Sequence, residues 1–185
     1  MDRSVPELKD DVVFLRRWGD GDIEANVATC RDAEVVRWMP RIPDPYDESD
    51  AREFLDHAAK GWEAGTFFGF AIAEHEAGRL IGSIGVSVNG AIGEVGYFVF
   101  AGERRRGIGE RALRLVGRWG LEELGLARFQ LSVIMGNDAS ARLAEKAGFK
   151  REGVLRAWMD NRGGRTDVIM HSLLPSEIGR LSGDQ

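Results

Sequence analysis

Apolar and polar residues alternate along this chain in two periods, which divide it into strands and helices. Period-two or continuous apolar runs predict strands over 12–16, 67–73, 80–88, 94–100, 129–134, 149–158 and 167–174. Helical spacing of apolar residues predicts helices over 20–31, 32–38, 49–64, 108–124 and 139–147. The predicted order of elements is therefore β-α-α-α-β-β-β-α-β-α-β-β.

Short polar residues and glycines mark the ends of these elements. Asp20 and Asp32 are candidate N-caps, and Gly65 and Gly148 follow two helices at the position that favours a left-handed residue. Turns are expected at 75–78 and at Asn89-Gly90, so the strands between residues 67 and 100 form an antiparallel meander.

A strand–helix–strand crossover follows the meander and implies a parallel pair formed by the strands 94–100 and 129–134. We therefore expect one mixed α/β (α+β) sheet with helices on both faces. A length of 185 residues fits a single domain, 1–185, with its core over about 12–174.

Composition excludes several classes of protein. The formal net charge is −5, which argues against a nucleic-acid binder, and no apolar run approaches the ~20 residues that span a bilayer. Residues 1–6 lack a basic start followed by an apolar stretch, so we expect no signal peptide and a cytoplasmic protein. The single cysteine, Cys30, cannot form an internal disulfide and is expected to be a buried residue.

The segment from Glu94 to Gly109 carries the clearest chemistry. A strand ends at Phe100, three arginines follow, and Gly107-Ile-Gly109 opens an amphipathic helix. Residues 101–120 hold six arginines and two glutamates, so their sum is +4 while the rest of the chain is −9. Unpaired amides and the dipole at a helix N-terminus favour anions, so the pattern predicts a phosphate site.

These residues resemble the acyl-CoA-binding signature of the GNAT N-acetyltransferases, Gln/Arg-x-x-Gly-x-Gly/Ala, here Arg104-x-x-Gly107-x-Gly109. The later motifs 121–126, 136–140, 144–149 and 152–156 resemble the Rim branch, the ribosomal-protein alanine N-acetyltransferases and their relatives. The resemblance covers about 12–174, nearly the whole chain.

The resemblance implies the GNAT fold, with a mixed, mostly antiparallel sheet splayed between the fourth and fifth strands. It also implies acetyl-CoA as cosubstrate. The pyrophosphate would lie on the backbone of Arg104, Arg105, Arg106, Gly107, Ile108 and Gly109. The pantetheine arm would pair with Tyr97, Phe98 and Val99, and an N–H near Val99 would polarise the thioester carbonyl. Asn137 would hydrogen-bond the same arm.

Two residues are candidates for catalysis. Glu94 stands where Rim-type members carry a glutamate and would take the proton of the amine acceptor; the alternative is a carboxylate at a strand end facing solvent. Ser140 would protonate or hydrogen-bond the leaving thiolate; the alternative is an ordinary first-turn residue in a helix capped by Asn137 or Asp138.

The acceptor is expected to be a primary amine, either a protein N-terminus or a small molecule, attacked directly in a ternary complex. Trp38, Trp158 and Asp167 are candidates to contact it together with Glu94, although packing of the tryptophans (with Met39 and Trp62) and turn stabilisation by Asp167 are alternatives. The three histidines are isolated, so no metal site is expected. The protein would be a monomer or homodimer that binds neither nucleic acid nor membrane.

Two other functions compete with acetyl transfer. A non-catalytic coenzyme A-binding sensor or scaffold would keep the same signature. A dinucleotide-binding module would explain Gly107-x-Gly109-x-x-Ala112, but the motif follows a meander and lacks a clear ribose-binding acidic residue about 20 residues on.

Overall fold

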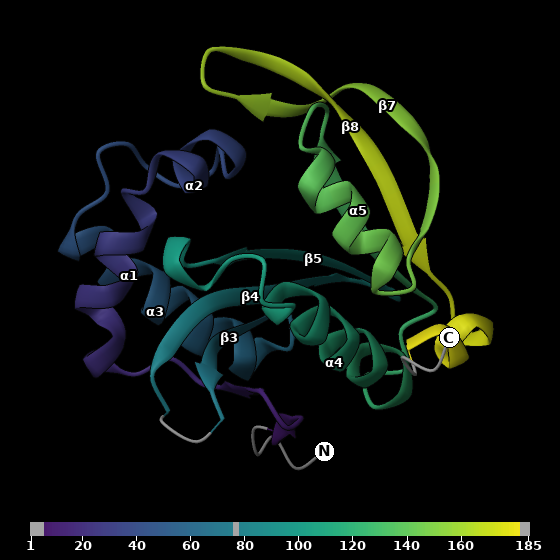
Figure 1. Cartoon of the computed structure of the whole chain (residues 1–185), viewed down its shortest axis with the longest axis horizontal. Coiled ribbons are helices and arrows are strands. Elements are labelled where there is room, and N and C mark those ends of the chain that lie inside the picture. The colour runs from purple at the N-terminus through teal and green to yellow at the C-terminus, as the bar shows by residue number, and fades with distance from the viewer. Residues whose placement is uncertain (1–5, 76–77, 182–185) are drawn as a thin grey trace. The chain divides into compact units, whose positions relative to one another are not determined.

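The computed structural model describes residues 6–75 and 78–181. Hydrogen bonds join eight strands in the order β1-β2-β3-β4-β5-β6-β8-β7 (Figure 1). Residues 1–5, on which the expected absence of a signal peptide partly rests, lie outside the described ranges. Residues 76 and 77, which belong to the expected turn at 75–78, also lie outside them.

The chain divides into two compact units, and strands β4 and β5 contribute residues to both. Unit 1 comprises the chain up to Gly85 together with Tyr97–Ile108, and unit 2 comprises Val86–Gly96 and the chain from Gly109 onward.

Unit 1 contains the first half of the predicted elements together with β1, a short strand that the sequence pattern did not predict. They are β1 (Leu8–Lys9), β2 (Val13–Arg16), η1 (Asp20–Asp22), α1 (Ile23–Cys30), α2 (Ala33–Trp38), α3 (Glu48–Ala64), β3 (Phe67–Glu74), most of β4 (Leu80–Asn89), the end of β5 (Ile92–Val99) and η2 (Ala101–Glu103). Strands β1, β2 and β3 pair antiparallel, and α3 packs against β3.

The predicted caps of unit 1 are confirmed with one exception. The Asp32 carboxylate accepts from the amides of Glu34 and Val35, and Gly65 ends α3 with a φ of 73°. The Asp20 cap is wrong, because α1 begins after Asp22. Asp22 instead accepts both arms of the Arg16 guanidinium at 2.7 Å, which ties the start of this helix to β2.

Unit 2 contains the crossover and the C-terminal hairpin. Its elements are the start of β5, α4 (Ile108–Glu122), β6 (Arg128–Ile134), α5 (Asp138–Lys146), β7 (Lys150–Asn161), β8 (Gly164–Leu173) and η3 (Pro175–Leu181). The hairpin strands are longer than the sequence pattern predicted, and α5 packs against them and β6 (Figure 1).

The predicted parallel pair is confirmed and is short. β5 pairs with β6 through Ile92–Arg128, Gly93–Phe129 and Glu94–Gln130, and the described residues form no ladder pair between these strands beyond that point. The pairs β1–β2, β2–β3, β6–β8 and β7–β8 are antiparallel, so the fold is the mixed, mostly antiparallel α/β sheet that was expected.

The core of unit 2 fixes which side chains β6 presents on each face. Phe129, Leu131 and Val133 are buried, and Phe129 packs against Phe149 and against the backbone of Gly120 in α4. Because side chains alternate along a strand, Arg128, Gln130 and Ser132 lie on the opposite face. This opposite face carries the polar residues of the candidate site.

Candidate active site

In unit 1, the loop from Arg104 to Ile108 has the conformation of an anion site. Arg105 and Gly107 have φ angles of 65° and 75°, both in the left-handed region, where glycine pays no steric cost. A Cβ placed on Gly107 would meet no other atom within 4 Å, so the space beside the loop is open to a ligand. The loop leads into α4, whose first amides have no intrahelical acceptor.

Two of the three loop arginines hold the loop in place. Arg104 donates to the Val99 carbonyl at 3.1 Å and to the Asp32 carboxylate at 2.5 Å, and this contact lowers the pKa of Asp32. Arg106 pairs with Glu103. Among the described residues Arg105 makes no ion pair and is exposed, so it is the loop side chain that remains available to a phosphate.

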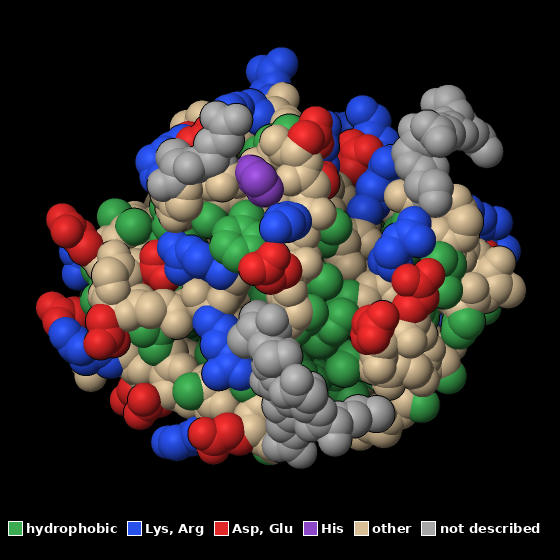
Figure 2. Space-filling view, turned by 90° about the horizontal axis from the view of Figure 1, so that it is seen from below, with side chains coloured by type: hydrophobic (Ala, Val, Ile, Leu, Met, Phe, Trp, Pro, Cys, Tyr) green, Lys and Arg blue, Asp and Glu red, His purple; other side chains and the backbone are tan. Residues whose placement is uncertain are grey.

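The positive charge predicted for residues 101–120 is therefore largely compensated inside the fold. Further along α4, Arg114 pairs with Glu110 at 2.8 Å, and Arg118 with Glu122 at 3.6 Å. On the face drawn in Figure 2, Lys and Arg side chains are interspersed with Asp and Glu. Attraction for an anion thus depends on the loop backbone and Arg105 more than on the sum of charges.

The end of β5 leads into this loop. The Phe98 side chain packs against the buried cluster of Ile23, Cys30, Tyr46 and Ala51, so only its backbone is available to a cofactor. Burial raises the pKa of the Cys30 thiol to about 12, which leaves almost no thiolate near neutral pH. Cys30 is therefore a packing residue, as its sequence context predicted.

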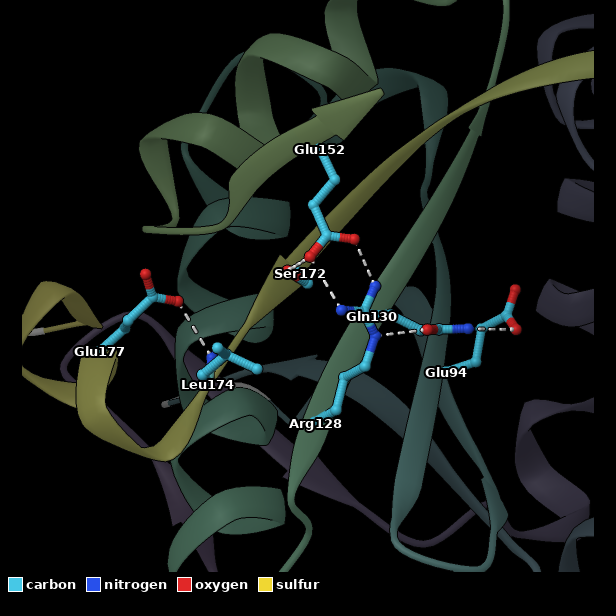
Figure 3. A network of polar contacts seen from close by, with 7 residues as sticks. All are labelled: Glu94, Arg128, Gln130, Glu152, Ser172, Leu174 and Glu177. Carbon is cyan, nitrogen blue, oxygen red and sulfur yellow. Dashed lines mark hydrogen bonds and ion pairs between the residues drawn. The ribbon is translucent and has the colours of Figure 1, made fainter. Parts of the chain in front are cut away.

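In unit 2, Glu94 stands at the last paired position of β5 and β6. Its carboxylate is half-buried and accepts from Ser132 Oγ at 3.0 Å. It also accepts from Gln130 Nε2 at 3.3 Å (Figure 3). Glu94 is therefore not a strand-end carboxylate surrounded only by water. It lies in a polar network on one face of the sheet.

Sequence reasoning missed the rest of this network. Arg128 donates to Gln130 Oε1 at 2.8 Å and to both oxygens of Glu152 at 2.8 and 2.6 Å, and Ser172 donates to Glu152 at 2.6 Å (Figure 3). The signal was present as the alternation Arg128-x-Gln130-x-Ser132 within a strand. Its partners on β5, β7 and β8 depend on register, which the pattern did not specify.

Asn137 and Ser140 meet at the start of α5. The Asn137 side chain accepts from the Ser140 amide at 3.1 Å, so Asn137 rather than Asp138 is the N-cap. Both side chains therefore lie at the positive end of the helix dipole, where a developing thiolate is stabilised.

The three remaining candidates lie in separate elements. Trp38 ends α2, half-buried, with its indole N–H donated to Glu34 and the Arg37 guanidinium over its ring. Trp158 on β7 is 51% exposed. Asp167 accepts from the amide of Ala157, a residue with φ of 48°, at 2.8 Å, so it stabilises the irregular backbone beside Trp158. By contrast, Trp62 is buried among Phe68 and Phe70.

No group of three or more His, Cys, Asp or Glu side chains in the described ranges is arranged to hold a metal ion. The described helices are also too short or too polar to cross a membrane.

A glycine-containing loop before a helix in unit 1 and a parallel strand pair ending at a carboxylate in unit 2 are both features that the resemblance to acyl-CoA-dependent N-acyltransferases implied. The family model "Acetyltransferase (GNAT) domain" matches residues 13–150. The chain belongs to this family, is an N-acetyltransferase, and uses acetyl-CoA as its donor; the family match removes the dinucleotide-binding alternative.

Several known proteins are similar over nearly the whole chain. The N-acetyltransferase YoaA of Bacillus subtilis is 29% identical over 172 residues, which cover 91% of this chain and 97% of YoaA. RimJ of Mycobacterium smegmatis, solved with a coenzyme A disulfide, aligns with a TM-score of 0.81 at 19% identity, covering 91% of this chain and 87% of RimJ. The microcin C7 self-immunity acetyltransferase MccE, solved with acetyl-CoA and AMP, aligns with a TM-score of 0.77 at 17% identity, covering 89% and 93%.

The Arg128–Glu152 ion pair should make the free energy of unfolding depend on pH in the acid range. Hydrogen bonds from Arg128 and Ser172 lower the pKa of Glu152 from its usual 4.5 to about 2. A carboxyl group whose pKa is lower in the folded chain than in the unfolded chain stabilises the fold at pH values above its unfolded pKa. This contribution is lost as the pH falls through the folded pKa. We expect Glu152→Gln to lower the unfolding free energy at pH 7, and the difference from wild type to shrink between pH 4.5 and about 2.

Denaturant unfolding across this pH range is the measurement. Glu53→Gln, on the exposed side of α3, serves as the control. A Glu152→Gln deficit that stays constant down to pH 2 would contradict the assignment.

Proposed function

We propose that this N-acetyltransferase moves the acetyl group to a primary amine, a protein N-terminus or a small molecule, by direct attack in a ternary complex. The observation that carries the proposal is the Glu94 carboxylate, which is held by Gln130 and Ser132 where the pairing of β5 and β6 ends. We also infer that the two units form one acetyltransferase domain, since β4 and β5 run through both.

For the donor, we assign the pyrophosphate to the backbone amides of residues 104–109 and to the Arg105 side chain. The left-handed residues in this loop and the open space beside Gly107 support the assignment. The backbone of Tyr97, Phe98 and Val99 would pair with the pantetheine arm, and Asn137 would bind the same arm through its amide nitrogen.

The chemistry requires proton transfers at the amine and at the leaving sulfur. An ammonium, with a pKa of about 8 at a protein N-terminus and about 10.4 for an alkyl amine, cannot attack, so the Glu94 carboxylate takes one proton from it, directly or through a water. The amine nitrogen then bonds to the thioester carbonyl carbon, and the C–S bond breaks. Ser140, at the start of α5, gives its hydroxyl proton to the coenzyme A thiolate, and the second proton that the nitrogen loses as the amide forms restores the Ser140 hydroxyl, directly or through a water. The buried Cys30 thiol, with its raised pKa, is unsuited to an acyl-enzyme route.

The charge of the chain favours a cationic acceptor, because the residues outside 101–120 sum to −9. The name of one structural neighbour, the ribosomal-protein-S5-alanine acetyltransferase of Vibrio fischeri, supports a protein acceptor. Trp38, Trp158 and Asp167 would contribute to acceptor recognition.

Coenzyme A release should be measured over a panel of N-terminal peptides, a polyamine and an aminoglycoside. At least one amine should turn over with acetyl-CoA. Acetyl-CoA binding without turnover on the whole panel would instead favour a non-catalytic sensor or scaffold.

Glu94→Gln should lower kcat by about 10²–10⁴ near neutral pH, because general base catalysis contributes about that much. The deficit should shrink as pH approaches the pKa of the acceptor, since the amine then loses its proton without help. The measurement is the pH dependence of kcat, with acetyl-CoA affinity expected to be unchanged. Glu123→Gln, exposed just after α4, is the control. An unchanged pH–rate profile would overturn the base role.

Arg105→Gly should weaken the donor site without straining the loop, because glycine adopts the φ of 65° easily. We expect KM for acetyl-CoA to rise about tenfold, roughly 1.4 kcal/mol for one charge-assisted contact, while kcat changes little. Steady-state kinetics are compared with Arg52→Ala, an exposed arginine on α3 that pairs with Glu48. A KM within twofold of wild type would remove Arg105 from the site.

A further inference from the structure

A row of polar side chains crosses unit 2 from β5 to β7. Glu94 is opposite Gln130 in the β5–β6 ladder, Gln130 is opposite Ser172, and Ser172 is opposite Lys150. Cross-strand neighbours lie about 4.5–5.5 Å apart, so the side chains of one row are within reach of one another. Figure 3 shows the side chains of Gln130 and Arg128 extended between Glu94 and Glu152.

The direction of each hydrogen bond in the row follows from chemistry. A guanidinium has donors and no acceptor, so Arg128 must face the oxygen of the Gln130 amide, at 2.8 Å. The amide nitrogen then points to Glu94 Oε2, at 3.3 Å. With Ser132 donating to Oε1, each carboxylate oxygen of Glu94 accepts one hydrogen bond and keeps lone-pair capacity for a proton.

Arg128 is itself fixed from the other side. Glu152 accepts two parallel hydrogen bonds from its guanidinium, the geometry that orients arginine most strictly. Glu152 in turn accepts from Ser172, which is 2% exposed and therefore rigidly placed. The orientation of the Gln130 amide is thus set by residues on three strands.

We propose that Gln130 is a positioning residue for the reaction: oriented by Arg128, its amide holds the Glu94 carboxylate in the rotamer that receives the acceptor proton. This inference rests on the proposed base role of Glu94. A glutamate side chain has three rotatable bonds, and a misplacement of about 1 Å at a reacting group costs up to about 10²-fold in rate. Gln130 acts through Glu94 and does not itself contact the substrate.

The test uses Gln130→Met, which keeps the length of the side chain and removes its hydrogen bonds. With the fastest amine of the panel as acceptor, we expect kcat to fall tenfold to a hundredfold. KM for acetyl-CoA should stay within twofold. Ser132→Ala removes the other donor and should give a smaller loss of the same kind; it keeps the test open if Gln130→Met is poorly folded. Glu123→Met, exposed just after α4 and outside this network, is the matched control and should keep wild-type kcat.

The deciding readout is the double variant with Glu94→Gln. If Gln130 acts through Glu94, Gln130→Met adds no further loss in that background, because the group it positions is gone. The positioning role of Gln130 would be overturned if Gln130→Met lowered kcat as much in the Glu94→Gln background as in the wild type, or if Gln130→Met had wild-type kcat. Either result would leave the base role of Glu94 standing. Normal activity of Glu94→Gln by itself would overturn the base role, and the inference with it.

Discussion

The register of the short parallel pair between β5 and β6 is the constraint on which the polar network around Glu94 depends. Packing of Phe129, Leu131 and Val133 into the core fixes the face that each residue of β6 presents. A slip of one residue would send these side chains to the polar face and bring Arg128, Gln130 and Ser132 into the core. The same packing that stabilises unit 2 therefore places the donors of Gln130 and Ser132 at Glu94.

In unit 1, ion pairs rather than apolar contacts shape the cofactor loop. Asp32 caps α2 and binds Arg104, so one carboxylate connects a helix start to the loop. Arg106 is neutralised by Glu103, and this leaves Arg105, held in a left-handed conformation, with its charge exposed. The anion site that we propose would thus depend on Arg105 and the loop backbone, because most of the arginines around the loop are already paired inside the fold.

Features set by local sequence were predictable, and features set by register were not. The order of elements from β2 onward, the Asp32 cap and the glycines at 65 and 148 follow from neighbouring residues, and the structure has them; the two-residue strand β1 was missed. The Asp20 cap failed because Arg16 draws Asp22 into an ion pair from another element. The partners of Arg104 and Gln130, 72 and 36 residues away, required the folded arrangement of strands. Glu94 was a candidate from family resemblance, and its role stays a prediction, whereas the sequence indicated the network that holds it only through the polar alternation along β6.

A crystal structure with bound coenzyme A is the sharpest test of the proposed donor site and of the proposed base, because it shows the loop 104–109 and Glu94 together. We expect the pyrophosphate on the amides of residues 104–109, with Glu94 still accepting hydrogen bonds from Gln130 and Ser132. A pyrophosphate bound elsewhere, or a Glu94 side chain turned away from both donors, would contradict these assignments.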